Sequence, residues 1–332
     1  MVGALYGAFE SGLIYALMAL GVYLTFRVLD FPDLTVDGSF VTGGAVSAIM
    51  IVNGSDPFLA TLLGGVAGFL AGCVTGLLHT KGNINPLLAG ILMMTALYSI
   101  NLRIMDMPNI PLLNQSTIFT KIEAWWNSLQ LDEILMKPFT ALGISDYAPR
   151  TFLVIVSMVV FVIIIKFVMD WLLQTEAGLA LRATGDNIRM VRSLSANTNR
   201  YIVMGLGLSN GLVAISGALI AQYNGFADVN LGIGMIVVGL ASVIIGEGLF
   251  GTKKIARTTL AVILGAIAYR IIIALALRVD FVDASDMKLI TAVIVVAALV
   301  IPHWWKQVKE NNRRHTKKRQ LHQNGKGENT HA

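Results

Sequence analysis

The sequence predicts an all-α polytopic membrane protein with about nine transmembrane helices. Its 332 residues are 55% hydrophobic and only 14% charged, whereas a soluble domain typically carries about 25% charged residues. The mean hydropathy is +0.69, and several apolar runs reach the roughly 20 residues that a helix needs to cross a bilayer. A soluble domain would need an apolar core larger than single domains build.

The first three apolar runs differ in character. Residues 4–28 are expected to be a true span and not a signal peptide, because no Lys or Arg precedes them and they contain Glu10. Residues 38–52 form a short, glycine-rich run, so the total lies between about 8 and 10 spans. Residues 58–79 carry glycines at intervals of four, which favour close helix packing in lipid: Gly64, Gly68, Gly72 and Gly76.

A long polar segment, residues 103–149, separates the fourth predicted span from the fifth and is expected outside the cell. Within it, "IFTKIEAWWNSLQ" places apolar and aromatic side chains on one side. This pattern predicts an amphipathic helix in the membrane interface, anchored by Trp125 and Trp126. Contact of the two tryptophans with a ligand is the alternative.

The remaining spans are predicted at 84–102, 151–173, 201–223, 232–250, 258–277 and 287–303. Residues 1–303 then form one transmembrane domain, followed by a basic tail, residues 304–332, whose composition predicts partial disorder. Lys and Arg gather on one side of the spans, in the loop at 174–200, around 253–257 and in the tail. The positive-inside rule makes this side cytoplasmic, so the N-terminus is outside and the C-terminus is cytoplasmic. We attribute the net charge of +5 to these loops and expect no nucleic-acid partner.

The cytoplasmic loop, residues 174–200, is polar yet favourable for helix. "EAGLALRATGDNIRMVRSL" predicts one or two short helices, with Leu179, Arg182 and Ala183 on a shared face beside the small Gly178. The run Gly185-Asp186-Asn187 predicts a helix end followed by a new N-cap. From the residues alone, the loop either docks in a groove on a soluble partner or is a basic loop held at lipid headgroups.

Charged side chains within spans are costly in lipid and are candidates for function. Lys166 and Asp170 are four residues apart, which predicts a structural pair on one helix face. Glu247 either braces the Gly-rich turn that follows it or belongs to an inner gate. Arg270 is expected to have an acidic or carbonyl partner, in a structural or a gating role.

Polar residues near span ends are weaker candidates. Asp33 and Asp37, in the link after the first span, predict an Asx-turn and an N-cap before the second span, with substrate or gate contact as the alternative. For Asn101, Gln222 and Asn224, hydrogen bonding in the interface is favoured over substrate contact. The pathway or gating candidates are therefore Glu10, Asp33, Asp37, Glu247 and Arg270.

The sequence offers no motif for catalysis. It contains no Gly-x-Ser-x-Gly or His-Glu-x-x-His run, and four of its five His lie after residue 302. We therefore expect no enzyme and no metal site. A Gly-x-x-x-x-Gly-Lys-Ser/Thr run is also absent, so this chain is not expected to bind ATP through a P-loop.

Three regions, in order along the chain, resemble the permeases of ABC importers, and more narrowly the branched-chain amino acid (Liv-type) family. The pattern Thr175, Gly178, Leu181-Arg182-Ala183 and Gly185-Asp186-Asn187 is similar to that family's coupling-helix loop. "SGLIYALMALGVYLTFRVLDF" resembles its opening span, and "SGALIAQYNGFADVNLGIGMIVVGLASVIIGEGLFGT" resembles its span-loop-span with a Gly-rich turn. "FPDLTVDGSF" replaces the family's usual Ala-His-Gly stretch, as in a subgroup often described as tryptophan or general amino-acid permeases.

The resemblance implies a division of labour in a bacterial cytoplasmic membrane. A separate ATPase dimer binds the ATP, so this chain needs no cofactor of its own. An extracytoplasmic binding protein delivers the substrate, and a second permease subunit, most simply a second copy, completes the pathway. The loop docks on the ATPase and drives alternating access. The implied coupling residues are Glu176, Gly178, Leu179, Arg182, Ala183, Gly185 and Asn187.

Two other functions compete with an importer of an amino acid or similar small polar solute. Ribose-type permeases use the same machinery to carry a sugar or a nucleoside. Their sequence motifs resemble those of Liv-type permeases, so the motifs discriminate poorly between the two. A secondary transporter, in contrast, would depend on an intramembrane carboxylate and would have no ATPase partner. Glu10 and Glu247 are the span carboxylates outside the Lys166–Asp170 pair.

Overall fold

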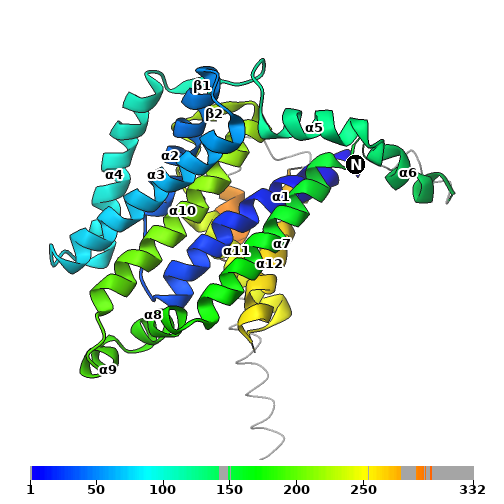
Figure 1. Ribbon diagram of the computed structural model, residues 1–332. Coiled ribbons are helices and arrows are strands. Elements are labelled where there is room, and N and C mark those ends of the chain that lie inside the picture. Colours follow the sequence, from blue (N-terminus) through cyan, green and yellow to red (C-terminus); the bar gives the residue numbers. More distant parts are fainter. Residues whose placement is uncertain are drawn as a thin grey trace, which may run out of the picture.

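The computed structural model describes residues 2–141, 149, 151–252, 254–277, 289–294, 296 and 300. These residues form a helical bundle with one small strand pair (Figure 1). The first half of the chain contains α1 (Val2–Tyr23), the π-helical turn η1 (Leu24–Val28), α2 (Thr35–Val52), α3 (Pro57–Thr80), α4 (Pro86–Met105), β1 (Asn109–Pro111), α5 (Ile118–Ser128) and α6 (Leu131–Ala141). The second half contains α7 (Leu153–Gln174), α8 (Glu176–Asp186), α9 (Ile188–Ser193), α10 (Thr198–Asn224), β2 (Phe226–Asp228), α11 (Met235–Phe250) and α12 (Ile255–Ala276).

The predicted fold class, an all-α polytopic membrane protein, is confirmed. Within the described residues, 7 helices are long and apolar enough to cross a membrane: α1 with η1, α2, α3, α4, α7, α10 and α12. The predicted span at 232–250 is α11, an apolar helix of only 16 residues. The predicted span at 287–303 falls largely outside the described residues, and the tail at 304–332 lies wholly outside them.

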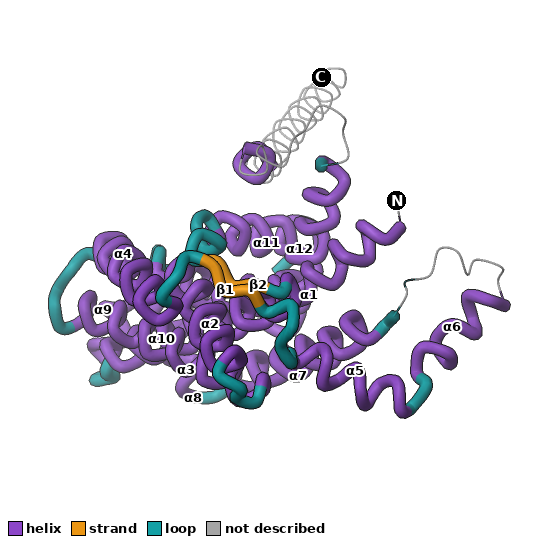
Figure 2. The backbone as a smooth tube through the Cα atoms, turned by 90° about the horizontal axis from the view of Figure 1, so that it is seen from above, coloured by secondary structure: helices purple, strands orange, loops and turns teal. Residues whose placement is uncertain are grey.

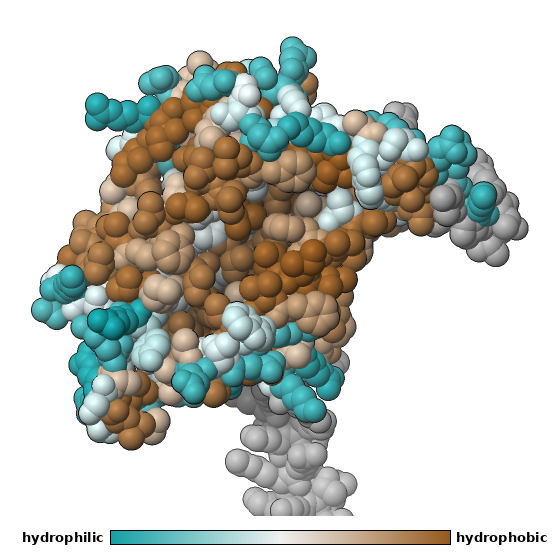
Figure 3. All heavy atoms as spheres, in the orientation of Figure 1, coloured by the Kyte–Doolittle hydropathy of each residue, from teal (hydrophilic) through white to brown (hydrophobic). Residues whose placement is uncertain are grey.

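The outer surface agrees with burial in lipid. Hydrophobic residues cover the middle of the face shown in Figure 3, and hydrophilic residues gather at its two ends. One end carries the paired strands β1 and β2, and we call it the β end; the other carries α8 and α9, and we call it the α8 end (Figure 1). Between the two ends, α4 and α7 are the most exposed spans: only 28% of the 18-residue apolar stretch in each is buried inside the protein.

The centre of the bundle is made by α1, α2 and α10. The 18-residue apolar stretch is 89% buried within the protein in α1, 78% in α2 and 72% in α10. The first span is therefore a core helix, and its own apolar side chains, such as Ile14, Leu17 and Leu20, are completely buried. A helix that is apolar all round and lies in the core cannot be identified by amphipathicity, and α1 and α2 are of this kind.

The β end is closed by an antiparallel pair of short strands, in which Ile110 of β1 faces Ala227 of β2. Figure 2 shows these strands above the helices, with α5 and α6 extending to one side. The predicted amphipathic helix is α5, which begins with a capping box between Thr117 and Thr120. Its Trp125 is 61% exposed, whereas Trp126 is 4% exposed. Trp125 therefore fits an anchor in the interface, whereas Trp126 packs against the protein.

The glycine face of α3 packs against α10 and α2, as its spacing predicts. A Cβ on Gly72 would lie 2.2 Å from the carbonyl oxygen of Leu206 in α10, and a Cβ on Gly68 would lie 2.2 Å from the Cβ of Ala214. Farther along, a Cβ on Gly64 would lie 2.9 Å from the carbonyl oxygen of Gly43 in α2. These contacts bring helix backbones together at distances that only glycine allows.

We predict that Gly72→Ala lowers the free energy of unfolding by about 1–3 kcal/mol, because the added methyl group meets a backbone carbonyl that cannot rotate away. Gly248→Ala is the matched control, since a Cβ at this helical glycine of α11 meets nothing within 4 Å. Thermal unfolding of the purified protein in detergent measures both variants. Equal unfolding temperatures for Gly72→Ala and the wild type would contradict the prediction.

Candidate functional site

The polar loop after α7 folds as two short helices, as the sequence predicts. The hydroxyl of Thr175 accepts a hydrogen bond from the backbone N–H of Gly178 at 3.2 Å and caps α8. After α8 ends at Asp186, the side chain of Asn187 accepts from the N–H of Met190 at 3.1 Å and caps α9. The predicted helix end and new N-cap are confirmed, and they give the loop a fixed shape at the α8 end.

Two glycines seat α8 against the bundle. A Cβ on Gly178 would lie 2.1 Å from the carbonyl oxygen of Leu172, at the end of α7. A Cβ on Gly185 would lie 2.1 Å from the carbonyl oxygen of Val28, at the end of η1. Gly178 is buried inside the chain, against the end of α7. Its missing side chain lets α8 rest directly on α7.

The opposite face of α8 and α9 is open and partly apolar. Leu179 is 52% exposed, Met190 is 50% exposed and Leu194 is 72% exposed. Glu176 and Asn187 are exposed as well, whereas Arg182 and Ala183 are half-buried. In Figure 3, a hydrophobic patch lies over α9 at the lower end of the molecule, beyond a band of hydrophilic residues. This face is the part of the α8 end that is available to a partner.

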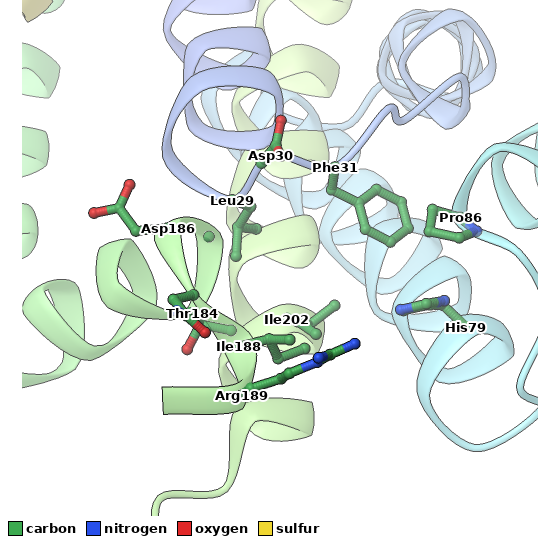
Figure 4. Close-up of a pocket in the computed structure, with 12 residues that line it drawn as sticks. Leu29, Asp30, Phe31, His79, Pro86, Thr184, Asp186, Ile188, Arg189 and Ile202 are labelled. Atoms are coloured by element: carbon green, nitrogen blue, oxygen red, sulfur yellow. The ribbon is translucent and has the colours of Figure 1, made fainter. Parts of the chain in front are cut away.

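A cavity of about 350 Å³ lies behind α8 and α9 (Figure 4). The link after η1 contributes Asp30 and Phe31, α3 contributes His79, and α9 contributes Arg189. The rings of Phe31 and His79 meet edge to face, with centroids 5.3 Å apart. The cavity therefore lies between the α8–α9 unit and the ends of α3 and α4.

Two ion pairs lie near the same end, one between elements and one within α7. The guanidinium of Arg27, in η1, pairs with Glu247, near the end of α11. Lys166 and Asp170 of α7 form the predicted pair, with 2.6 Å between Nζ and Oδ2. The hydroxyl of Thr259, in α12, donates to the other oxygen of Asp170 at 2.6 Å. Glu247 thus ties α11 to the segment on which α8 rests.

Asp33 lies at the bottom of the link between η1 and α2 and is completely buried. Its carboxylate accepts from the N–H of Thr35 at 2.9 Å, which confirms the predicted Asx-turn, and from the side-chain amide of Asn210 in α10 at 2.6 Å. Burial raises the pKa of Asp33 above its ordinary value, and these hydrogen bonds oppose the rise. The residue fixes the link to the core.

Asp37 has a different role from the predicted one. The N-cap position of α2 is occupied by Leu34, without a side-chain hydrogen bond. The carboxylate of Asp37 instead reaches across to α11, where it accepts from the N–H groups of Gly234 at 2.8 Å and Ile236 at 2.7 Å. The predicted N-cap on the second span is therefore wrong, because α2 begins at Thr35 and Asp37 lies inside its first turn, from which its carboxylate reaches the start of α11.

Glu10 and Arg270 lie near each other toward the β end. Tyr223 of α10 donates from its hydroxyl to Glu10 at 2.8 Å. The Nε of Arg270 donates to the hydroxyl of Ser11 at 3.1 Å, and its guanidinium lies 4.4 Å from the ring centroid of Tyr15. Among the described residues the partner of Arg270 is thus a hydroxyl and an aromatic face, not the expected carboxylate or carbonyl.

The structure does not bring the five pathway candidates into one site. Glu10 and Arg270 share the α1–α12 contact, Glu247 lies at the α8 end, and Asp33 and Asp37 secure two irregular segments. Sequence reasoning missed their partners Arg27, Asn210 and Tyr223. Asn210 alone had a readable signal, because an amide in the middle of an apolar span needs hydrogen-bond partners.

These features define a multi-pass membrane protein with a structured polar loop between two spans. Residues 5–301 match the model of a family described as the permease component of branched-chain amino acid transport systems. The chain therefore belongs to this family of membrane permease components of ABC transport systems.

The chain is also similar to individual relatives. It is 40% identical over 302 residues to a tyrosine transport system permease protein of Clostridioides difficile, covering 91% of this chain and 92% of the relative. It is 33% identical over 296 residues to an uncharacterized protein of Rickettsia prowazekii, covering 88% and 95%. A ribose import permease protein of Bacillus subtilis is 26% identical over 240 residues, covering 70% and 65%. No solved structure matches the chain.

We predict that Asp37→Asn destabilises the protein by about 0.5–2 kcal/mol. The amide keeps one acceptor oxygen, but its NH2 group, a donor, then faces the N–H of Gly234 or Ile236 where a carboxylate oxygen accepted before. Asp30→Asn is the control, since Asp30 is exposed and its φ of 51° suits asparagine. Thermal unfolding in detergent is the measurement. A destabilisation by Asp30→Asn as large as that by Asp37→Asn would contradict the capping role.

Proposed function

We propose that this chain is the membrane subunit of a bacterial importer that moves an amino acid, driven by a separate ATPase that docks on α8 and α9. The observation that supports this proposal most directly is the exposed apolar face at the α8 end. Leu179, Met190 and Leu194 are exposed on α8 and at α9, and the same segment carries Arg182, Arg189 and Arg192. A groove on a soluble protein would cover them and remove this apolar surface from water.

The seating of α8 supports a coupling role. Gly178 and Gly185 hold α8 directly on the backbone of α7 and η1, with no flexible side chain between them. A displacement of α8 would therefore move the ends of two long helices. In this proposal, Leu179 enters the groove, and Glu176, Arg182, Ala183 and Asn187 complete the docking surface by charge and shape.

The remaining parts of the proposal follow from the family. ATP is bound by the partner ATPase dimer, so this chain carries no cofactor. A substrate-binding protein delivers the solute to the β end, and a second permease subunit, most simply a second copy of this chain, completes the pathway. The N-terminus then lies outside, the α8 end lies in the cytoplasm, and the membrane is the bacterial inner membrane.

The substrate class rests on similarity. The relative that covers most of this chain at 40% identity is described as a tyrosine transport permease, and this favours an amino acid. Relatives described as ribose or autoinducer-2 import permeases cover less of the chain and are 26% and 28% identical. A sugar-type solute is therefore the second candidate within the same machinery. A secondary transporter is the alternative outside it, and it would work without an ATPase.

We predict that Leu179→Arg abolishes co-purification of the ATPase encoded with this permease, because a charged side chain would then be buried in an apolar groove. Arg182→Glu should weaken the association by about 10-fold or more, through the loss of a charge pair. Leu113→Arg is the matched control, because Leu113 is 83% exposed at the β end. ATP hydrolysis and co-purification from membranes are the two measurements.

If Leu179→Arg and Leu113→Arg both leave the association intact, α8 is not the docking surface. If wild-type permease binds no ATPase and uptake follows the proton gradient, the chain works as a secondary transporter. Gly178→Arg is a different test, because Gly178 is buried. It should unseat α8 and lower the unfolding temperature as well as the ATPase association.

A further inference from the structure

A second cavity adjoins the one behind α8 and α9, at the same end of the molecule. Its volume is about 380 Å³, within the range of about 300–1,000 Å³ that ligand pockets occupy. The ends of three helices meet around it: Thr80 is the last residue of α3, Asn85 caps α4, and Asn199 lies in the first turn of α10. His79 lines both cavities, so the two lie side by side. We call the second one the Arg192 cavity, after the side chain that α9 contributes to it.

Arg192 is held in a fixed position at this cavity. Its Nε donates to the hydroxyl of Thr198 at 3.1 Å, and its Nη2 donates to the Oδ1 of Asn199 at 3.5 Å. A guanidinium group has five N–H donors, so three remain for a ligand. No Asp or Glu is among the described residues that line the cavity, and Arg192 forms no ion pair with any described residue. The cavity therefore contains a positive charge without a counter-charge.

Two asparagines between α3 and α4 add donors to the lining. The Oδ1 of Asn85 accepts from the N–H of Leu87 at 3.0 Å and caps α4, so the NH2 group of Asn85 keeps both hydrogens for another acceptor. Asn83 has a φ of 52°, in the left-handed region that asparagine tolerates, and its side chain forms no hydrogen bond with the described residues. Amide N–H groups beside a guanidinium suit an anionic oxygen.

Arg189 brings a second positive charge to the adjoining cavity. It is three residues from Arg192 on α9, so the two side chains share a face of that helix. Figure 4 shows the guanidinium of Arg189 directed toward the ring of His79, whereas the carboxylates of Asp30 and Asp186 point away from the space between them. Among the described residues, Arg189 forms no ion pair. The two cavities together are therefore a positively charged recess at the ends of α3 and α4.

Exposed apolar surface begins beside this recess, on the two spans that carry its asparagines. Leu77 is exposed in the last turn of α3, and Leu87 and Leu88 are exposed in the first turn of α4. Ile91 and Leu92 continue this surface one turn farther along α4, which is among the most exposed spans. A soluble anion would use the donors of the recess but not this surface. A phospholipid uses both, because its phosphate accepts from the donors while its acyl chains cover the leucines.

We infer that the Arg192 cavity binds the headgroup phosphate of an anionic phospholipid from the leaflet at the α8 end, and that Arg189 adds attraction from the adjoining cavity. Basic recesses between spans at the cytoplasmic surface are typical sites for anionic headgroups. The inference goes beyond the proposed function, because lipid binding needs neither an ATPase nor a substrate. It also gives the two faces of α9 different partners: Arg189 and Arg192 bind lipid, and the exposed Met190 and Leu194 remain for the ATPase.

The test uses the full-length permease, purified and delipidated in a neutral detergent, and follows its unfolding temperature while phosphatidylglycerol is added. Phosphatidylcholine with the same acyl chains, which has no net charge, is the reference lipid. A ligand that binds the folded state stabilises it, so phosphatidylglycerol should raise the unfolding temperature to a plateau above that in phosphatidylcholine. Arg192→Gln should weaken the apparent affinity for phosphatidylglycerol by about 10- to 100-fold, the usual contribution of a hydrogen bond to a charged group.

Two further variants separate headgroup binding from folding and from net charge. Asn83→Asp places a negative charge beside the phosphate, and aspartate tolerates the positive φ at this position. It should weaken the binding of phosphatidylglycerol and leave the unfolding temperature in phosphatidylcholine unchanged. Arg200→Gln makes the same substitution as Arg192→Gln at an exposed position of the same end that lines neither cavity. It should bind phosphatidylglycerol like the wild type.

Any of four results would overturn the inference. If phosphatidylglycerol stabilises the wild type no more than phosphatidylcholine does, the site does not exist. If Arg192→Gln and Arg200→Gln weaken binding equally, the lipid responds to the overall charge of this end and not to the cavity. If Asn83→Asp binds like the wild type, the phosphate lies elsewhere. If glycerol phosphate, the soluble headgroup fragment, stabilises the protein as phosphatidylglycerol does, the cavity binds a soluble phosphate and not a lipid. None of these measurements involves the ATPase, so a failure of the proposed function would not affect them.

Discussion

The rest of this structure depends on one constraint: backbone N–H and C=O groups surrounded by lipid must find partners within the protein. Regular helices meet this constraint by themselves, but the link after η1 and the loop before α11 do not. Asp33 supplies an acceptor to the first, through the N–H of Thr35, and Asp37 supplies two to the second, through Gly234 and Ile236. Two buried carboxylates in so apolar a chain thus have a structural reason.

Close backbone contact is the second constraint, and it connects the fold with the proposed coupling. The same device, a glycine against a carbonyl, occurs where α3 meets α10 at Gly72 and where α8 meets α7 and η1 at Gly178 and Gly185. In the core it replaces the hydrophobic effect, which does not drive helices together in lipid. At the α8 end it makes α8 a rigid extension of the bundle. The sequence pattern around Gly178 therefore reports on internal packing.

The sequence was sufficient for features that depend on local patterns. Apolar runs predicted the spans, the spacing of glycines predicted the packed face of α3, and Asn187 predicted the break between α8 and α9. It was insufficient where partners are distant along the chain. Nothing near Asp37 indicates that its carboxylate caps a helix that begins 198 residues later, at Met235. Likewise, Arg270 meets Ser11 and an aromatic ring because α12 packs on α1, and no local pattern contains that contact.

The short helix α11 connects the two ends of the molecule. Its start is held by Asp37 of α2, and its last turn carries Glu247, which pairs with Arg27 in η1. Since η1 is one of the two supports of α8, α11 joins the surroundings of α8 to Asp37 through a helix of 16 residues, about 24 Å in length. A stiff helix fixed at both ends by carboxylates transmits displacement better than a loop does.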